Sequence, residues 1–258
     1  MIKHLKNKLK ALLRELKLSN YIYFCPICNS NIENFIPLPD SYRKNAEIHG
    51  YKYFGENEHL NIHQYSCPVC GSADRDRFYA TFLKKHITDN IPEKTLLHIA
   101  PAWKLNDLFL KKYVKVVTTD LMMKGVDYYM HIEDMKEFEE NTFDYFICSH
   151  VLEHVKHPDK ALQELYRILK PNGIGIIMAP INPNIQYTIE DPSHISKEDR
   201  IKHYGQDDHL RLFSKSDFIN RIKKANFKLQ LYGIDYFGER TFKKIGLKES
   251  SILYVGIK

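Results

Sequence analysis

Hydrophobic positions follow two different periods along the chain from about residue 95 onward. Short apolar runs typical of buried strands occupy residues 95–100, 114–119, 128–132, 143–149, 174–181, 228–232 and 251–257. Apolar residues at helical spacing occupy 105–113, 157–169 and 218–225, and Lys170-Pro171-Asn172-Gly173 predicts a turn after the second helix. Strands that alternate with helices predict an α/β fold, with a parallel sheet covered on both faces. Two successive strands at the end predict an antiparallel edge hairpin.

Four cysteines precede this alternating region as two Cys-Pro-x-Cys pairs, Cys25/Cys28 and Cys67/Cys70. Each pair spaces two thiolates for one metal ion, and four thiolates complete the closed tetrahedral shell of structural zinc. A disulfide-bonded or redox set is the alternative. It is disfavoured because no convincing signal peptide precedes the cysteines. The fifth cysteine, Cys148, lies in an apolar run and is interpreted as a buried small residue.

These patterns divide the chain into three parts: a basic amphipathic helix (1–20), a four-cysteine zinc-binding module (21–78) and a larger α/β domain (79–258). In the first part, leucines recur at helical spacing between lysines and arginines. This helix is expected to dock on the protein itself or on a partner subunit. Peripheral binding to an anionic membrane or to nucleic acid is the other interpretation.

Composition narrows the class of protein further. Of the 258 residues, 43% are hydrophobic, which is sufficient for a large core, and no 18-residue apolar run indicates a membrane span. The formal net charge of +6 is modest. Paired Cys-x-x-Cys motifs without an export signal predict a cytoplasmic protein.

The ends of the predicted strands are the places to look for ligands, because open α/β sheets bind them at the carboxyl ends of strands. Asp120 closes the second strand, where a carboxylate can accept hydrogen bonds from a ribose diol. An Asp after a strand can also be simply a capping residue. The first strand runs into His98-Ile99-Ala100-Pro101 without the glycine-rich turn of dinucleotide sites. The sequence therefore disfavours a pyrophosphate-containing cofactor and permits one without phosphates.

A second polar group follows the fourth strand, in Ser149-His150-Val151-Leu152-Glu153-His154. If the chain is helical from Val151, then His150, Glu153 and His154 share one face by their spacing. A buried histidine bonded to backbone is the alternative interpretation of His154.

At this point the chain resembles class I S-adenosylmethionine-dependent methyltransferases, through the stretch 143–155 and the following Ala161-Leu162-x-Glu164-Leu165-x-Arg167-x-Leu169-Lys170-Pro171-x-Gly173. More narrowly, it is similar to a bacterial subgroup with an N-terminal four-cysteine zinc module. That subgroup has a His-Ile-Ala-Pro first loop and a Tyr-Gly-Gln-x-Asp-His-x-Arg segment, here residues 98–101 and 204–211. The resemblance covers the chain from about Cys25 to its end.

The resemblance implies a seven-stranded Rossmann-like methyltransferase sheet with an antiparallel last strand. It implies Ala100 and Pro101 beside the methionine moiety of S-adenosylmethionine, Asp120 on its ribose, and Ser149 beside the sulfonium. The full set of implied cofactor-binding residues is His98, Ala100, Pro101, Asp120, Leu121, Ile132, Asp134, Ser149 and His150. Asp134 is included on the adenine side because the acid common before Ile132 in the subgroup is His131 here.

The segment after the fifth strand is dense in Asp, His and Arg, and long loops beside strand ends commonly form acceptor sites. A solvated surface loop is the alternative. Arg and His together suit an anionic acceptor, so a small phosphate- or sugar-containing acceptor is expected rather than nucleic acid. The resemblance adds surface-polysaccharide or glycan modification as the context. The expected catalytic residues are His150 at the sulfonium, His154 and His209 as bases, and Arg211 orienting the acceptor.

Two other functions fit the same residues. The first is metal-assisted RNA methylation, in which His150, Glu153, His154 and His209 gather around one divalent ion. The second is a non-catalytic, zinc-stapled binding protein on a methyltransferase fold. The leading interpretation remains methyl transfer from S-adenosylmethionine, with the four cysteines holding a structural zinc.

Overall fold

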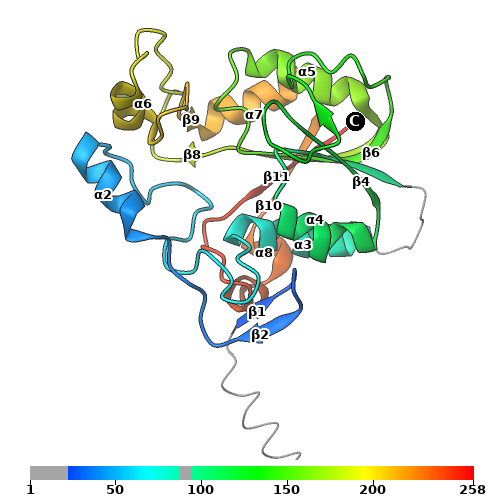
Figure 1. The fold of residues 1–258 in the computed structure, drawn as a ribbon, viewed down its shortest axis with the longest axis horizontal. Helices are drawn as coiled ribbons and strands as arrows, with labels where there is room; N and C mark the ends of the chain where they lie inside the picture. Colours follow the sequence, from blue (N-terminus) through cyan, green and yellow to red (C-terminus); the bar gives the residue numbers. More distant parts are fainter. Residues whose placement is uncertain (1–22, 88–93) are drawn as a thin grey trace, which may run out of the picture.

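A seven-stranded mixed sheet forms the centre of the protein (Figure 1). The computed structural model describes residues 23–87 and 94–258, so the basic helix expected at 1–20 lies outside the described residues. The strands follow the order β5-β4-β3-β6-β7-β11-β10. Their bounds are Thr95–Ile99 (β3), Lys115–Asp120 (β4), Tyr128–Tyr129 (β5), Phe143–Ser149 (β6), Leu169–Met178 (β7), Lys228–Tyr232 (β10) and Leu253–Ile257 (β11).

Strand direction confirms the predicted topology. Strands β3 to β7 are parallel to one another, whereas β11 lies between β7 and β10 and is antiparallel to both. The chain moves outward from β3 through β4 to β5 and then returns to β6 on the other side of β3. This reversal puts the carboxyl ends of β3 and β6 side by side, where ligands of α/β sheets bind.

Helices cover both faces of the sheet (Figure 1). On one face lie α3 (Asp74–His86), α4 (Trp103–Leu108) and α8 (Ile234–Phe237), and on the other lie α5 (Pro158–Ile168) and α7 (Lys215–Lys224). The remaining short elements are η1 (Leu110–Lys112), β8 (Ile181–Asn182), α6 (Lys197–Tyr204), β9 (Phe213–Ser214) and α9 (Glu239–Lys244).

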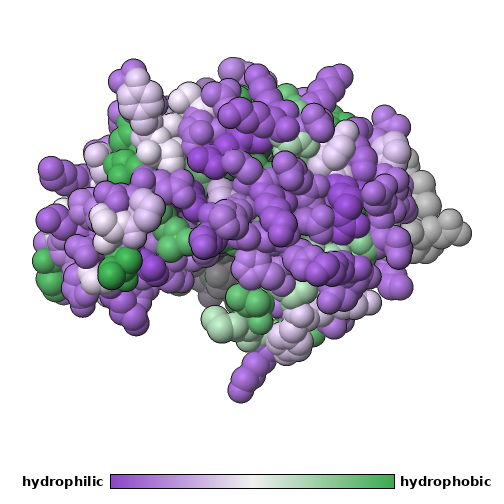
Figure 2. All heavy atoms as spheres, turned by 90° about the horizontal axis from the view of Figure 1, so that it is seen from above, coloured by the Kyte–Doolittle hydropathy of each residue, from purple (hydrophilic) through white to green (hydrophobic). Residues whose placement is uncertain are grey.

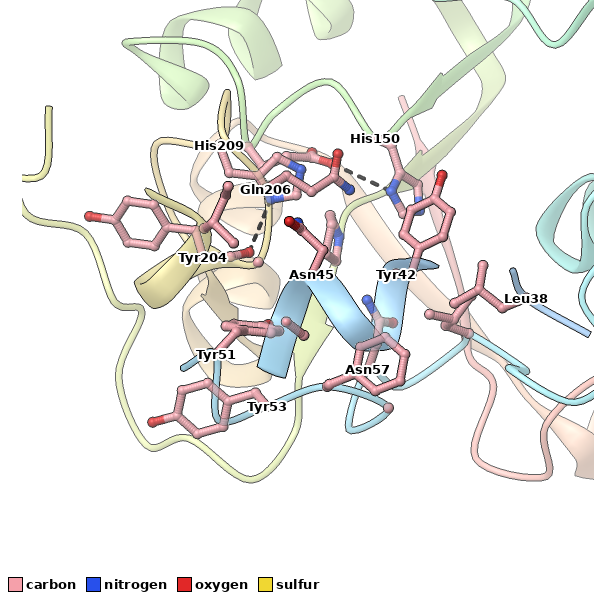
Figure 3. Close-up of a pocket in the computed structure, with 18 of the residues that line it drawn as sticks. Leu38, Tyr42, Asn45, Tyr51, Tyr53, Asn57, His150, Tyr204, Gln206 and His209 are labelled. Carbon is pink, nitrogen blue, oxygen red and sulfur yellow. Dashed lines mark hydrogen bonds and ion pairs between the residues drawn. The ribbon is translucent and has the colours of Figure 1, made fainter. Parts of the chain in front are cut away.

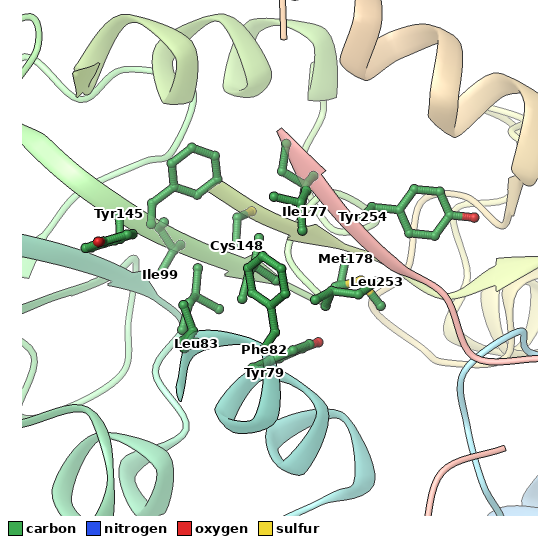
Figure 4. Packing of buried hydrophobic residues seen from close by; sticks show 14 of the residues in the cluster. Tyr79, Phe82, Leu83, Ile99, Tyr145, Cys148, Ile177, Met178, Leu253 and Tyr254 are labelled. Atoms are coloured by element: carbon green, nitrogen blue, oxygen red, sulfur yellow. The ribbon is translucent and has the colours of Figure 1, made fainter. Parts of the chain in front are cut away.

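The core lies on both faces of the sheet, and Figure 4 shows the part between α3 and the middle strands. Phe82 and Leu83 of α3 point toward Ile99 of β3 and Met178 of β7. Cys148 of β6 is fully buried in this cluster, as its apolar surroundings in the sequence predicted. Burial on both faces explains why these central strands are continuous apolar runs.

Some elements differ from the sequence-based expectations at their boundaries. The expected helix 105–113 divides into α4 and η1, and the turn expected at 170–173 is a bulge inside β7. There, Phe143 pairs with Leu169 while Tyr145 pairs with Ile174, and Asn172 takes a positive φ of 62°. The segment from Val151 forms turns, and helix α5 begins only at Pro158.

The cysteine-containing part packs directly against the sheet domain. It comprises β1 (Tyr23–Cys25), β2 (Ser30–Ile32) and α2 (Asp40–His49), and the expected boundary between residues 78 and 79 lies inside α3. The guanidinium of Arg77 in α3 is completely buried and stacks 3.7 Å from the ring centroid of Phe35. It donates to backbone carbonyls on both sides of the junction: those of Gln64, Tyr65, Ser72, Ile245 and Gly246.

A second junction is centred on the buried carboxylate of Glu58. It accepts hydrogen bonds from Lys215 Nζ (2.5 Å) and from the Tyr254 hydroxyl (2.7 Å). The backbone N–H of Glu58 also donates to Ile181 O at 3.0 Å. These contacts fix the segment between the two cysteine pairs to α7, β11 and β8.

The surface is mainly polar. On the face seen in Figure 2, hydrophobic side chains form small separate groups among hydrophilic ones. Within residues 23–87 and 94–258, every helix is too short or too polar to cross a membrane.

Replacing Arg77 with Leu should destabilise the protein strongly, because several buried carbonyls lose their donor. We expect a loss of about 3–5 kcal/mol in the free energy of unfolding, measured by denaturant titration. Arg43→Leu is the matched control, since Arg43 lies on the exposed surface of α2 and should leave stability nearly unchanged. Equal stability of the two variants would contradict the role given to Arg77.

Acid stability should depend on His98, which is 2% exposed and whose Nδ1 contacts Asn106 Oδ1. Burial lowers the pKa of His98 to about 4. The unfolded imidazole takes up a proton near pH 6.5, so the stabilisation is full above that pH and is lost as pH falls toward 4. In urea titrations, His98→Gln should reduce the acid-dependent loss by roughly 3 kcal/mol. If the free energy of unfolding falls equally with decreasing pH in His98→Gln and in the parent, His98 does not control acid stability.

Candidate active site

The adjacent ends of β3 and β6 carry two residues in an unusual conformation. Ala100 directly follows β3 and His150 directly follows β6, with φ values of 48° and 57°. Non-glycine residues rarely adopt positive φ, and such strain persists where the surrounding structure enforces it, often at functional sites. The N–H of Ala100 donates to Thr119 O (2.9 Å), which ties this loop to the end of β4.

Asp120 ends β4 beside that loop, as the sequence predicted. Its Oδ1 accepts hydrogen bonds from the N–H groups of Met122 and Met123, both at 2.7 Å, and so caps the following turn. Its Oδ2 has no hydrogen-bond partner within the parts of the chain that the structure describes. Asp120 therefore serves as a cap and still keeps one carboxylate oxygen for a ligand.

The other expected cofactor residues lie around the same strand ends in different environments. Ser149 bonds through Oγ to the Tyr79 hydroxyl (2.7 Å), and His98 is buried against Asn106. Asp134 is exposed and pairs with Lys136 at 2.7 Å. Pro101 and Ile132 are buried, whereas Leu121 is 56% exposed. Ser149 and Asp120 are thus partly exposed at the strand ends, whereas His98 bonds α4 to β3.

A cavity of about 610 Å³ opens on the other side of His150 (Figure 3). One wall comes from the sheet domain, with His150, Glu153, His154, Tyr204, Gln206 and His209. The opposite wall comes from the segment between the cysteine pairs and the start of α3, with Tyr42, Asn45, Tyr51, Asn57, His59 and Arg75. Helices α2 and α6 therefore flank a common pocket.

Histidine and glutamate side chains gather at the inner end of this cavity. Glu153 Oε1 lies 3.4 Å from His150 Nδ1 and 3.9 Å from His154 Nε2. The rings of His154 and His209 meet edge to face with centroids 4.8 Å apart. His150 Nε2 in turn lies 3.1 Å from Nε2 of His59. Although residues 151–157 are turns, the cluster expected from the sequence is therefore assembled.

Burial sets the charge of this cluster. It lowers the pKa of His59 to about 3 and of His209 to about 4, and holds the pKa of His150 well below its usual range. Burial raises the pKa of Glu153 to about 8. The cavity consequently presents neutral imidazoles, which can accept protons or bind metals.

Arg211 is buried next to the turn that carries Glu153 and His154. Its side chain is 1% exposed, and Nη1 donates to the carbonyls of Leu152 (2.8 Å) and Val155 (2.6 Å). Nη2 pairs with Glu190 at 2.6 Å. Its donors are thus directed at the turn that presents Glu153 and His154, so its position suits organising that turn rather than contact with an acceptor.

Arg75 is the cation that lines the cavity itself. Its guanidinium makes no hydrogen bond or ion pair within residues 23–87 and 94–258, and it lies opposite the sheet-domain wall. Asp76 and Asp74 act on this guanidinium only through space, so its hydrogen-bond donors can still bind phosphate or carboxylate. Neither Arg75 nor His59 could be predicted from the sequence, because only folding carries the segment around the second cysteine pair to the sheet edge.

The four expected metal-binding cysteines converge beside β1. All four Sγ atoms lie within 4.8 Å of one another, and both Cys25–Cys70 and Cys28–Cys67 are separated by 3.8 Å. Four thiolates at about 2.3 Å from one zinc ion lie about 3.8 Å apart in a tetrahedron. All five cysteines are free thiols, so the disulfide interpretation does not hold in this structure.

Comparisons with known proteins agree with this geometry. Residues 108–177 match a family described as a methyltransferase domain. UbiE, a ubiquinone/menaquinone biosynthesis C-methyltransferase from Hydrogenovibrio crunogenus, is 39% identical over 57 residues, 22% of either chain. UbiE from Escherichia coli O1:K1 is 30% identical over 82 residues, which span 32% of this chain and 33% of that relative.

Among solved structures, phosphoethanolamine N-methyltransferase 2 from Haemonchus contortus, in complex with S-adenosyl-L-methionine, is similar with a TM-score of 0.47 and 15% identity. The similar region covers 73% of this chain and 53% of the Haemonchus contortus chain. The match to curated relatives spans a third of their length or less. Residues 108–177 are thus similar to a methyltransferase domain, and the seven-stranded α/β sheet is consistent with Rossmann-like methyltransferases.

Proposed function

We propose that this protein transfers a methyl group from S-adenosylmethionine to an oxygen or nitrogen atom of a small anionic acceptor. The observation that carries the proposal is the juxtaposition of two sites at one sheet edge. Asp120 and the strained Ala100 and His150 form the cofactor side, and the 610 Å³ cavity forms the acceptor side. The methyltransferase-domain match over 108–177 supports the choice of cofactor.

The cofactor residues fit a nucleoside without phosphates. The free oxygen of Asp120 can accept a hydrogen bond from a ribose hydroxyl, and no glycine-rich phosphate loop is required. Ser149 and His150, at the end of β6, lie between the proposed cofactor site and the cavity. When bound, S-adenosylmethionine supplies a methyl group on a positively charged sulfur: the acceptor atom bonds to the methyl carbon, and the electrons of the broken S–C bond stay on sulfur.

In this proposal, the side chains of the cavity hold the acceptor in position and accept its proton. Holding the acceptor in line with the methyl group supplies much of the acceleration, since the sulfonium is already activated. A hydroxyl acceptor also loses its proton, and the imidazoles of His150, His154 and His209 are the candidates to take it. Arg211 positions the turn that carries His154.

We propose a phosphate- or sugar-containing acceptor, in the context of surface-polysaccharide or glycan modification. Arg75 supports the anionic part. The rings of Tyr42 and Tyr51 and the amides of Asn45 and Asn57 support a sugar, because aromatic faces pack on sugar rings and amides bond to hydroxyls. Separately, we propose that the four cysteines bind one structural zinc, whose closed thiolate shell leaves no position for a substrate.

Titration calorimetry with S-adenosylmethionine tests the cofactor site. Asp120→Asn keeps the oxygen that caps Met122 and Met123 but replaces the other with a donor, so affinity should fall at least about tenfold. Asp107→Asn is the control, because Asp107 is exposed on α4 and paired only with Lys111. If the unaltered protein gives no heat at millimolar cofactor, the alternative of a non-catalytic binding protein replaces this proposal.

Methyl transfer itself can be followed with labelled S-adenosylmethionine and a bacterial small-molecule extract. Label should enter the fraction retained on an anion exchanger. His154→Ala and His209→Ala should each reduce this incorporation at least about 100-fold while cofactor affinity stays unchanged. Full incorporation by both variants would remove these histidines from the mechanism.

Metal analysis tests the zinc site. The purified protein should contain about one zinc per chain, and Cys28→Ser should lose most of it and unfold at a lower temperature. Cys148→Ser is the matched control, because Cys148 lies in the core away from the other four and should retain the zinc. Retention of zinc by Cys28→Ser would contradict the assignment.

A further inference from the structure

We propose that Glu153, His154 and His209 bind a divalent first-row transition-metal ion at the inner end of the acceptor cavity, separate from the four-cysteine site. Each residue offers one ligand atom, and these atoms lie within 4.8 Å of one another. Donors about 2.1 Å from a shared ion can be up to about 4.2 Å apart, so small side-chain shifts would bring the three together.

Glu153 is the strongest sign of a missing ligand. Its side chain is completely buried, yet neither carboxylate oxygen has a hydrogen-bond partner within the described residues. A buried carboxylate without partners is costly, and native proteins normally pair such a group or use it to coordinate a metal. Oε1 of Glu153 lies near the rings of His150 and His154. A cation bound between the carboxylate and the histidines would give the buried carboxylate a partner.

The two histidines are oriented as metal ligands usually are. His209 Nδ1 lies 3.2 Å from the carbonyl oxygen of Tyr204, so it carries the proton and leaves Nε2 with a lone pair. His154 Nδ1 lies 3.3 Å from Asp208 Oδ2, and its Nε2 faces Glu153. In metal sites, a carbonyl or carboxylate on the second ring nitrogen fixes the tautomer in the same way.

The three ligand side chains indicate which metal ions would bind and whether the bound ion could reach a substrate. Two imidazoles and one carboxylate suit Zn²⁺, Mn²⁺, Fe²⁺ or Co²⁺ and leave coordination positions open. All three residues line the 610 Å³ cavity, so those positions face the proposed acceptor. On this point the inference rests on the proposed function: the ion would bind an acceptor hydroxyl or anionic oxygen and lower the pKa of the hydroxyl. With His154 and His209 coordinated to the ion, neither can accept that proton, and His150 is the histidine of the cluster left to take it.

The two proposed metal sites differ in chemistry, and this difference permits a clean test. Thiolates select zinc, whereas Mn²⁺ prefers nitrogen and oxygen ligands. The zinc-containing full chain is therefore titrated with Mn²⁺, and free Mn²⁺ is measured by electron paramagnetic resonance. We expect one Mn²⁺ per chain, with affinity at least tenfold weaker in Glu153→Gln and His209→Ala.

Asp191→Asn is the matched control. Asp191 is an exposed carboxylate 3.9 Å from His194, whose ring stacks on His203, so it reproduces a histidine–carboxylate group on the surface. Its replacement should leave Mn²⁺ binding unchanged. Glu153→Gln is nearly isosteric and replaces a side chain that burial already keeps protonated, so thermal unfolding of the metal-free variant should show a folded protein about as stable as the parent.

Two results would overturn the inference: no Mn²⁺ bound at micromolar to millimolar concentration, or equal binding by Glu153→Gln and the parent. In either case Glu153 is simply a protonated buried acid. Binding of S-adenosylmethionine is measured in parallel. Loss of cofactor binding with Mn²⁺ binding intact refutes the proposed function and leaves the metal site standing, whereas the opposite pattern refutes only the metal site.

Discussion

The buried guanidinium of Arg77 is the constraint on which the arrangement of the whole protein depends. A charge with no exposed surface is tolerated only when its donors are satisfied, and here they are satisfied by carbonyls from both the cysteine-containing part and the C-terminal segment. Neither part alone can complete that set. Since α3 also packs under the sheet through Phe82, the cysteine knuckles, the sheet and the C-terminal segment are held in one fixed relation.

This fixed relation creates the acceptor cavity. The segment between the cysteine pairs is secured by Arg77 at one end and by the Glu58–Lys215 and Glu58–Tyr254 contacts nearer the sheet. It can therefore hold Arg75 and His59 opposite the histidines that follow β6. The cysteine cluster, though remote from any reacting atom, contributes to the cavity by holding this wall in place.

The sequence predicted the fold well where the signals are local. Apolar runs located β3, β6 and β10, and the Pro158 start of α5 was missed by only one residue. The turns at 151–157 were not foreseen, because the carbonyls that bond to Arg211 come together only in the folded chain. For the same reason Arg75 and His59 escaped notice: their roles depend on contacts with residues more than 70 positions away, which no local pattern encodes.

The residues that face the acceptor from the N-terminal side belong mainly to the stretch between Cys28 and Cys67, which is 38 residues long. The two cysteine knuckles bound this stretch, and the contacts of Glu58 and Arg77 fix its residues 58–65 to the rest of the fold. Helix α2 takes no part in these contacts and buries only Ala46, so its exposed residues can vary while the sheet and the histidine cluster remain as they are. Such a division lets substitutions on a single helix reshape one wall of the cavity without altering the sheet that carries the other wall.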